Sequence, residues 1–389
     1  MRLIATFGDA LPILVASFVA AALLALLGTP VVVKVARRLG YVDEPNHRRV
    51  NAAPIPRGGG IAVAFAFLVV AIVLVVVNER TNLFADPRGL EASEFVVVVF
   101  GGIVATLLGI LDDALQLRAR WQLLTQLLVA MIPVVAGVTV TYIANPVGPD
   151  QILLSEPFAI GFTVVWVLGM INSINFIDGL DGLSSGIALI AAMTLGLISF
   201  STAIAQPLVG VLCFVLAGAL LGFLRWNFHP ATIFIGTSGV MFVGYTLAIL
   251  SILGTAKVAV ALLVLGVPVI DTFWIIVRRL ATGHSPFTPD RGHIHHRLLD
   301  LGLSHAQTVL VIYGICIVLA LLSVVLSGSG QLYAFLGLAV AFGLGLFLLS
   351  RGESGDALEA QSYDNGHTPE PQPNPEPNHG PNQVNSNSH

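Results

Sequence analysis

Long apolar runs separated by short polar segments dominate the chain. A helix needs about 20 apolar residues to cross the hydrocarbon core of a membrane. Eleven runs approach that length: 11–33, 60–77, 95–111, 122–138, 158–174, 183–201, 206–222, 233–253, 258–277, 308–327 and 331–350. Glycine and polar residues weaken the signal in 183–201 and 233–253. The pattern predicts an all-α, polytopic membrane protein with about eleven transmembrane helices.

The distribution of basic residues predicts how these helices are oriented. If alternate loops face inward, the inner segments are 34–59, 112–121, 175–182, 223–232, 278–307 and the C-terminal tail, and they hold 14 of the 18 Lys and Arg residues. Lysine and arginine concentrate in cytoplasmic loops. The N-terminus is therefore expected outside and the C-terminus in the cytoplasm.

Composition agrees with a membrane protein. Only 10% of the 389 residues are charged, 56% are hydrophobic and the mean hydropathy is +0.87, whereas soluble domains carry about 25% charged residues. The net charge of −4 identifies no partner, and we expect no nucleic-acid binding. Residues 1–350 are expected to form the integral membrane domain. Residues 351–389 are polar and rich in Pro and Asn, so we expect a disordered cytoplasmic tail.

Four polar clusters interrupt the apolar pattern at the predicted inner ends of the helices. They are Asp112-Asp113, the run 172–182, the stretch 225–239 and the run 293–297. Ionised side chains are costly near lipid, at roughly 2.5–3.5 kcal/mol each at a helix centre. Their gathering at one face predicts a membrane-embedded enzyme. A transporter is the alternative class, but transporter sites lie near the midplane of the bilayer.

The spacing of the acids suggests separate tasks. Asp112 and Asp113 are adjacent and point about 100° apart on a helix, although a solvated helix boundary alone would also account for them. Asp178 and Asp181 are three residues apart and share one face of a helix or turn. The same run holds Asn172 and Asn175 as well as Gly179 and Gly182, and a bland turn needs no such concentration of amides and acids.

The order of these motifs resembles a known family, the bacterial polyprenyl-phosphate N-acetylhexosamine-1-phosphate transferases of glycosyltransferase family 4. The matching pieces are Asp43-Glu44-Pro45-Asn46, Pro54-Ile55-Pro56-Arg57-Gly58-Gly59-Gly60, Leu111-Asp112-Asp113, the run 172–183, Phe223-Leu224-Arg225-Trp226-Asn227 and His293-Ile294-His295-His296-Arg297. The histidine run is similar to that of the family branch that loads GlcNAc-1-phosphate onto undecaprenyl phosphate. The resemblance also implies eleven helices with the N-terminus outside.

The resemblance implies a reaction in which a lipid phosphate attacks the β-phosphate of a UDP-N-acetylhexosamine and releases UMP. The enzyme would lie in the bacterial cell membrane with its active site on the cytoplasmic face. Whether it forms a homodimer is left open. Mg²⁺, with Mn²⁺ as the alternative, would neutralise the approaching anions. Mg²⁺ prefers carboxylate and amide oxygens as ligands. Such oxygens are supplied by Asp113, Asp178, Asp181 and Asn175. Asp112 is then the candidate that positions or deprotonates the lipid phosphate, and the four aspartates form the expected catalytic set.

The remaining polar residues are assigned to substrate. We expect substrate contacts from Asn172, Asn227, Arg291, His293, His295, His296 and Arg297, because guanidinium groups match phosphate oxygens. For the histidines, a zinc site and a purely structural loop are the alternatives. Arg48, Arg49 and Arg57 either bind lipid head groups or only satisfy the charge asymmetry of the loops.

Three positions depart from the family pattern. Arg49-Val50-Asn51 replaces a basic-x-His pair, Gln116 stands where some members have a third acid, and the third departure concerns the metal. The family usually has Gly-Asp-x-Gly-Ser where this chain has Gly236-Thr237-Ser238-Gly239-Val240. The resemblance implies that the aspartate is a metal ligand, so Thr237 takes a ligand position with only a neutral hydroxyl. We expect an active variant. A catalytically impaired relative that binds lipid-linked intermediates is the alternative.

Overall fold

The computed structural model describes residues 7–43, 54–81, 90–145, 151–201, 206–253, 257–281, 293–326, 329–341 and 343–344. The elements are α1 (Phe7–Leu39), β1 (Val42–Asp43), β2 (Ile55–Pro56), α2 (Gly60–Thr81), α3 (Ala92–Leu115), α4 (Ala119–Val135), β3 (Tyr142–Ala144), β4 (Gln151–Leu153), α5 (Glu156–Ile177), α6 (Leu183–Ser199), α7 (Pro207–Asn227), α8 (Gly236–Ile252), α9 (Lys257–Val264), α10 (Gly266–Ala281), α11 (Ile294–Asp300) and α12 (His305–Val325). A further apolar helix spans Ser329–Ala341.

The helical class is confirmed, and the count of about eleven transmembrane helices stays a prediction. Every one of the eleven predicted segments is helical within the described residues. Six of these helices, namely α1, α2, α3, α5, α7 and α12, are long and apolar enough to cross a membrane, and a bent pair gives a seventh. The helices α4, α6, α8 and Ser329–Ala341 are apolar but shorter. The structure therefore supports a polytopic membrane protein with six or seven full-length spans.

The segment 258–277 is not the single helix that its apolar run predicted. The chain bends by 78° between α9 and α10. Pro268 lies just after the bend, where its ring and its missing N–H prevent a regular helix from running through. A Cβ on Gly266 would also collide with the side chain of Leu338. Hydropathy alone does not register this break, because both arms are apolar.

The core is built around α7, and the outer helices present apolar side chains outward. Of the apolar window in α7, 89% is buried, whereas only 28% of that in α1 is buried. Gly218 and Gly222 let α7 approach the backbone of α1, since a Cβ at either position would collide with a carbonyl of α1. The helices α3 and α5 pack against α8, and α12 packs against α6. Exposed residues such as Leu27 and Leu107 then suit contact with lipid.

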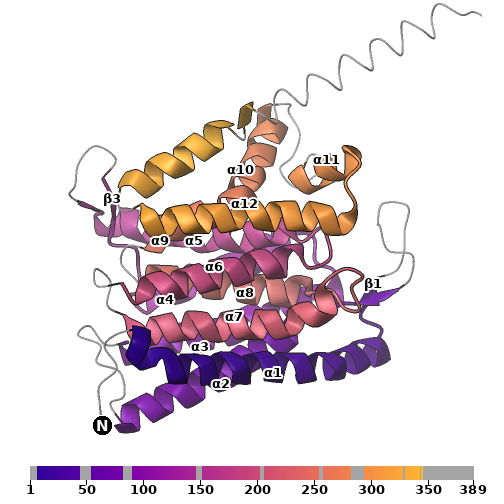
Figure 1. Ribbon diagram of the computed structural model, residues 1–389, viewed down its shortest axis with the longest axis horizontal. Helices are drawn as coiled ribbons and strands as arrows, with labels where there is room; N and C mark the ends of the chain where they lie inside the picture. Colours follow the sequence, from indigo (N-terminus) through magenta and orange to yellow (C-terminus); the bar gives the residue numbers. More distant parts are fainter. Residues whose placement is uncertain are drawn as a thin grey trace, which may run out of the picture. The chain divides into compact units, whose positions relative to one another are not determined.

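Two short antiparallel strand pairs, which the hydropathy pattern did not predict, mark opposite ends of the helix array (Figure 1). In the pair β1–β2, Asp43 is aligned with Ile55, and this pair lies at the same end as α11. In the pair β3–β4, Tyr142 is aligned with Leu153. The end that carries β1 is also the end where the polar motifs gather.

The chain divides into two compact units, Met1–Val340 and Ala341–His389. Nearly all of the second unit lies outside the described residues. The expected membrane domain 1–350 and the expected disorder of 351–389 therefore stay predictions.

Candidate functional site

The last turn of α3 brings Asp113 to the first turn of α8. Asp113 Oδ1 accepts the backbone N–H of Thr237 at 2.9 Å, and Oδ2 accepts that of Ser238 at 3.0 Å. The first N–H groups of a helix have no partner within the helix and attract negative charge. Gly236 has φ +73°, and a Cβ there would collide with Asp113 Oδ2 and with the backbone of Gly58. The departure at Thr237 thus lies directly beside a predicted metal ligand.

The segment around Arg57 joins this junction from the N-terminal side. The N–H groups of Gly59 and Gly60 donate to the carbonyls of Phe234 and Ile235 at 2.9 and 2.8 Å, so the segment is fixed to the start of α8. Arg57 forms an ion pair with Asp43, and its charge also reaches Asp178. Arg57 is therefore part of the site, which sequence reasoning had left undecided.

Asp178 follows the end of α5 and is enclosed by other charged groups. Ser184 Oγ donates to its Oδ1 at 2.5 Å. Burial raises the pKa of Asp178 to about 7, and the negative charges of Asp113 and Asp181 act in the same direction, whereas Ser184 and Arg57 oppose them. Buried carboxyls that destabilise each other's charge are favourable ligands for a divalent cation. This donor set fits the predicted Mg²⁺, and Asn175 lies one turn earlier on α5.

Asp112 faces away from this junction. It is 3% exposed, and Gln122 Nε2 on α4 donates to both of its oxygens, at 3.1 and 3.0 Å. The backbone N–H of Leu117 also donates to Oδ1 at 3.2 Å. The two adjacent aspartates therefore have different surroundings, which agrees with the separate tasks expected from their positions on a helix.

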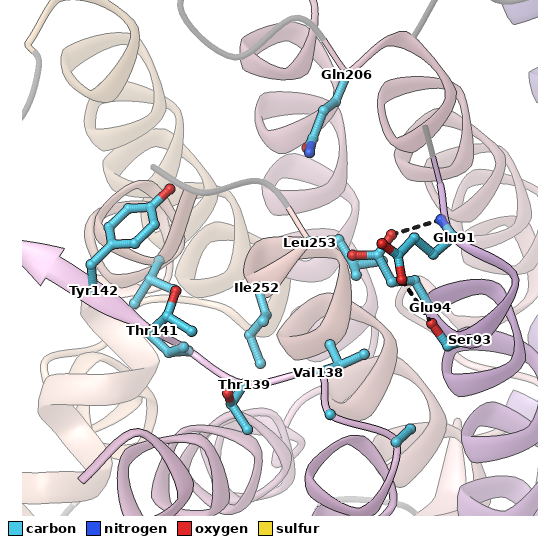
Figure 2. A pocket seen from close by; sticks show the side chains of 14 residues that line it. Glu91, Ser93, Glu94, Val138, Thr139, Thr141, Tyr142, Gln206, Ile252 and Leu253 are labelled. Carbon is cyan, nitrogen blue, oxygen red and sulfur yellow. Dashed lines mark hydrogen bonds between the residues drawn. The ribbon is translucent and has the colours of Figure 1, made fainter. Parts of the chain in front are cut away.

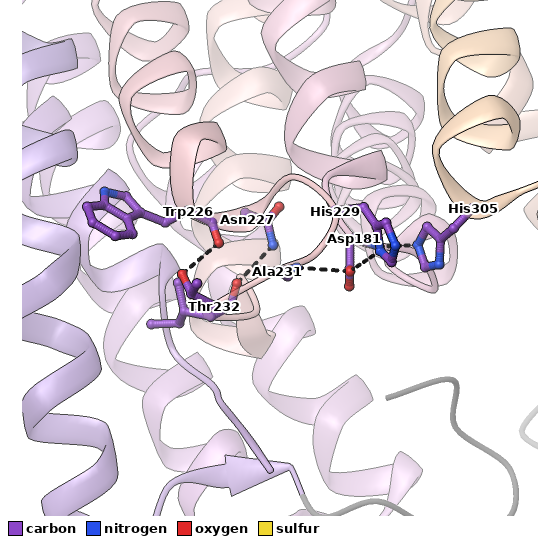
Figure 3. Close-up of polar contacts among 8 residues, drawn as sticks. Asp181, Trp226, Asn227, His229, Ala231, Thr232 and His305 are labelled. Carbon is purple, nitrogen blue, oxygen red and sulfur yellow. Dashed lines mark hydrogen bonds and ion pairs between the residues drawn. The ribbon is translucent and has the colours of Figure 1, made fainter. Parts of the chain in front are cut away.

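Asp181 lies in the turn between α5 and α6 and contacts two histidines (Figure 3). Its Oδ2 is 2.8 Å from His229 Nδ1 and accepts the backbone N–H of Ala231 at 3.1 Å. The backbone N–H of Asp181 donates to His305 Nε2 at 2.9 Å. Neither His229 nor His305 was singled out from the sequence.

The histidine run forms the start of α11, and Asp271 of α10 contacts its first two residues. Asp271 is 1% exposed; its Oδ2 is 2.7 Å from His293 Nδ1, and its Oδ1 accepts the backbone N–H of Ile294 at 3.0 Å. The predicted loop therefore contains a short helix whose N-terminus is capped by Asp271. Hydropathy had absorbed Asp271 into an apolar span, although an acid there marks a specific partner by default.

His295 connects α11 to the acidic turn. A Cβ on Gly179 would collide with its ring, so glycine at that position permits the approach. Burial, with smaller contributions from His296, His293 and His305, holds the pKa of His295 well below its usual range. His295 is therefore a neutral hydrogen-bonding group rather than a positive charge. Positive charge at this end comes from arginines such as Arg57 and the buried Arg297.

The two asparagines predicted to bind substrate are bonded within the protein. Asn172 Nδ2 donates to Gln126 Oε1 on α4 and to the carbonyl of Leu168, both at 2.8 Å. Asn227 is 2% exposed; it accepts from Ser185 Oγ at 2.5 Å and donates to the carbonyl of Ile233 at 3.1 Å. Asn227 thus shapes the loop after α7, and its contact with substrate stays a prediction. Arg291 lies outside the described residues.

A cavity of about 350 Å³ lies at the other end of the helices. Glu91, Glu94, Gln206 and Tyr142 are among its lining residues (Figure 2). Glu94 lies in the first turn of α3 and Asp113 in its last turn, so at about 1.5 Å per residue the two are roughly 30 Å apart. The cavity is therefore separate from the site built by the polar motifs.

Comparison with known proteins identifies the family. Residues 95–255 match the model of glycosyl transferase family 4. The chain is 36% identical over 327 residues to a "probable undecaprenyl-phosphate N-acetylglucosaminyl 1-phosphate transferase" of Bacillus subtilis, covering 81% of this chain and 86% of that protein. It is 33% identical over 367 residues to a decaprenyl-phosphate N-acetylglucosaminephosphotransferase of Mycolicibacterium smegmatis, covering 86% and 88%. A Thermotoga maritima undecaprenyl-phosphate alpha-N-acetylglucosaminyl 1-phosphate transferase is 28% identical, covering 82% and 91%.

With its motif aspartates gathered at one end of a helical membrane domain, this chain belongs to glycosyl transferase family 4 and is an enzyme of the polyprenyl-phosphate N-acetylhexosamine-1-phosphate transferase family.

Proposed function

We propose that the protein transfers GlcNAc-1-phosphate from UDP-GlcNAc to undecaprenyl phosphate and releases UMP at the cytoplasmic face of the bacterial cell membrane. The three relatives described above all carry GlcNAc and a prenyl phosphate in their names. The positive-inside distribution of Lys and Arg supports the cytoplasmic placement. The observation that carries the proposal is the half-buried group of Asp113, Asp178 and Asp181 with Arg57 within electrostatic reach.

The reaction exchanges one phosphorus–oxygen bond for another. An oxygen of the lipid phosphate attacks the β-phosphorus of the sugar nucleotide, the bond from that phosphorus to the bridging oxygen breaks, and UMP leaves with the bridging oxygen. The second pKa of a phosphate monoester is about 6, so the attacking phosphate is largely dianionic near neutral pH. We therefore assign Asp112 to positioning the lipid phosphate. Gln122, which donates a hydrogen bond to Asp112, would assist it.

Repulsion between the two anionic substrates is the main barrier that the site has to lower. Mg²⁺, or Mn²⁺ in its place, would neutralise the pyrophosphate and stabilise the departing UMP when bound. We assign its ligands to Asp113, Asp178 and Asn175, with the Thr237 hydroxyl beside them. Arg57 and Arg297 would attract phosphate oxygens, while neutral His295 would offer a hydrogen bond to the sugar or a phosphate.

The test is metal-dependent release of UMP by the purified full-length protein, supplied with UDP-GlcNAc and undecaprenyl phosphate. We expect UMP only when both substrates and Mg²⁺ are present, and no product after chelation with EDTA. Asp178→Asn should abolish release, whereas Asp300→Asn, an exposed acid at the end of α11, is the matched control. UMP release that persists without lipid phosphate or without metal would contradict the proposal.

A further inference from the structure

Three segments that lie far apart in the sequence place one metal-binding side chain each at a common point. They are Asp181 in the turn after α5, His229 in the loop after α7, and His305 at the start of α12. One ligand atom from each lies within 4.8 Å of the other two. Figure 3 shows the carboxylate and the two imidazoles together. No role in the transfer reaction has been assigned above to the two histidines.

The spacing of these atoms is close to that of a tetrahedral metal site. Bonds from zinc to nitrogen or oxygen are about 2.0–2.2 Å, so ligand atoms of such a site lie roughly 3.4 Å apart. Asp181 Oδ2 is 2.8 Å from His229 Nδ1, and the remaining separations extend to at most 4.8 Å. The two imidazole rings are stacked with centroids 4.4 Å apart and planes 14° apart. Because the lone pair of an imidazole nitrogen lies in the plane of its ring, an ion bound by both histidines requires one of the stacked rings to turn, and it replaces the contact between Asp181 Oδ2 and His229 Nδ1.

The cluster is held in place before any ion binds. Tyr313 Oη on α12 donates to the carbonyl of Gly182 at 2.5 Å, and a Cβ on Gly186 would collide with the same tyrosine ring. The start of α12 is thereby fixed against the turn that carries Asp181. Among the described residues, His305 Nδ1 is a buried nitrogen with no hydrogen-bond partner. Such an atom costs about 1–3 kcal/mol, which suggests that the ring has a further use.

The donor chemistry differs from that of the proposed Mg²⁺ site. Mg²⁺ prefers oxygen ligands and nearly octahedral geometry, whereas two imidazoles and one carboxylate suit Zn²⁺ and similar transition metals. We propose that Asp181, His229 and His305 form a second cation site, selective for Zn²⁺ over Mg²⁺, that connects the α5–α6 turn to the α7–α8 loop and to α12. Three protein ligands leave one position open to water or another ligand.

The test is a metal titration of the purified full-length protein after EDTA treatment, with neither substrate present. Its background carries His367→Gln, His379→Gln and His389→Gln, because histidines near the C-terminus could bind metal on their own. Co²⁺ serves as the probe, since its visible absorption reports a tetrahedral site. We expect one Co²⁺ per chain, displaced by ZnCl₂ and unaffected by a large excess of MgCl₂.

Matched variants locate the ion. His229→Gln alone should weaken binding at least about tenfold, because even the loss of an outer partner of a metal ligand costs 10–100-fold. The double variant with His305→Gln should lose the absorption band, and His296→Gln should retain it. The proposal would be overturned if the band survived in the double variant or disappeared with His296→Gln. It would also be overturned if no band formed in a protein with an unchanged melting temperature. Because no substrate is present, the outcome is independent of the transferase proposal.

Discussion

Asp113 and Asp178 are both acids of the proposed metal site, but their surroundings stabilise charge to different degrees. Asp113 accepts two backbone N–H groups at the start of α8, a favourable position for a carboxylate. Asp178 is buried beside other acids, which raises its pKa to about 7. The proposed cation would therefore stabilise the charge of Asp178, and the two backbone N–H groups fix the position of Asp113.

Removing either charge should stop transfer without unfolding the protein. Asp113→Asn and Asp178→Asn keep the shape of the side chain but remove the ligand charge, and we expect turnover to fall at least about a hundredfold, as for other groups that stabilise charge in a transition state. Asp112→Asn and Asp181→Asn should do the same. The measurement is initial rate against melting temperature, with Asp300→Asn as control. Near-normal turnover in two of the four variants would show that the site is wrong.

Thr237 is a residue where this chain departs from the family pattern, and its backbone N–H already bonds to Asp113. Thr237→Asp would place another carboxylate at the proposed cation, and even 1 kcal/mol of added attraction tightens binding about fivefold. We expect half-maximal activity at a lower Mg²⁺ concentration. Thr232→Asp, an exposed threonine of the loop before α8, controls for charge in general. An equal effect in both variants, or none in either, would place position 237 outside the metal shell.

At the scale of elements, the bend between α9 and α10 and the short helix α11 position the histidines. The apolar run 258–277 predicted one span, because Gly266 and Pro268 are too few to lower its hydropathy. The motif His293–Arg297 was found from its spacing, yet its partner Asp271 was missed because the two lie 22 residues apart. Local patterns identify the residues of a motif, whereas the contacts that orient them depend on tertiary packing.

The Asp271–His293 contact gives a prediction at this scale. Asp271→Asn keeps an acceptor for the N–H of Ile294 but loses the charge facing His293. Hydrogen bonds to charged groups contribute about 1.5–3 kcal/mol, so kcat/KM for the sugar nucleotide should fall about tenfold or more. A stabilising lipid should restore the melting temperature of the Asp271→Asn variant but not its kcat/KM. That result would show that Asp271 positions α11 rather than only stabilising the fold. An unchanged kcat/KM would show that the contact between Asp271 and His293 does not position α11 for the sugar nucleotide.

At the scale of the whole molecule, hydropathy located the apolar helices but neither their lengths nor the short helix α11. Segments such as α6 and α8 are shorter than a full span; α6 begins directly after the turn that carries Asp181, and α8 begins at Gly236, next to Thr237. The gathering of acids at one end was predicted from their places at the ends of apolar runs. The contacts of Asp181 with His229 and His305 could not be predicted, since these residues are 48 and 124 positions away.

The predicted orientation can be checked by labelling. In a background in which the buried residues Cys213 and Cys316 are replaced by Ala, Glu79→Cys and Asp300→Cys place thiols at exposed positions on opposite ends of the helices. The positive-inside distribution predicts that an impermeant maleimide labels intact cells only at position 79, and labels both positions after permeabilisation. Labelling of position 300 from outside would separate the site from cytosolic nucleotide sugars.

The most direct test of the central claim follows the two phosphorus atoms of the donor. UDP-GlcNAc labelled at the β-phosphorus and, separately, at the α-phosphorus is incubated with the purified protein, undecaprenyl phosphate and Mg²⁺. Transfer of a sugar phosphate predicts that the β label moves into the lipid while the α label stays with UMP, in equal amounts. If both labels left together as UDP, or if no label entered the lipid, the proposed reaction would be contradicted.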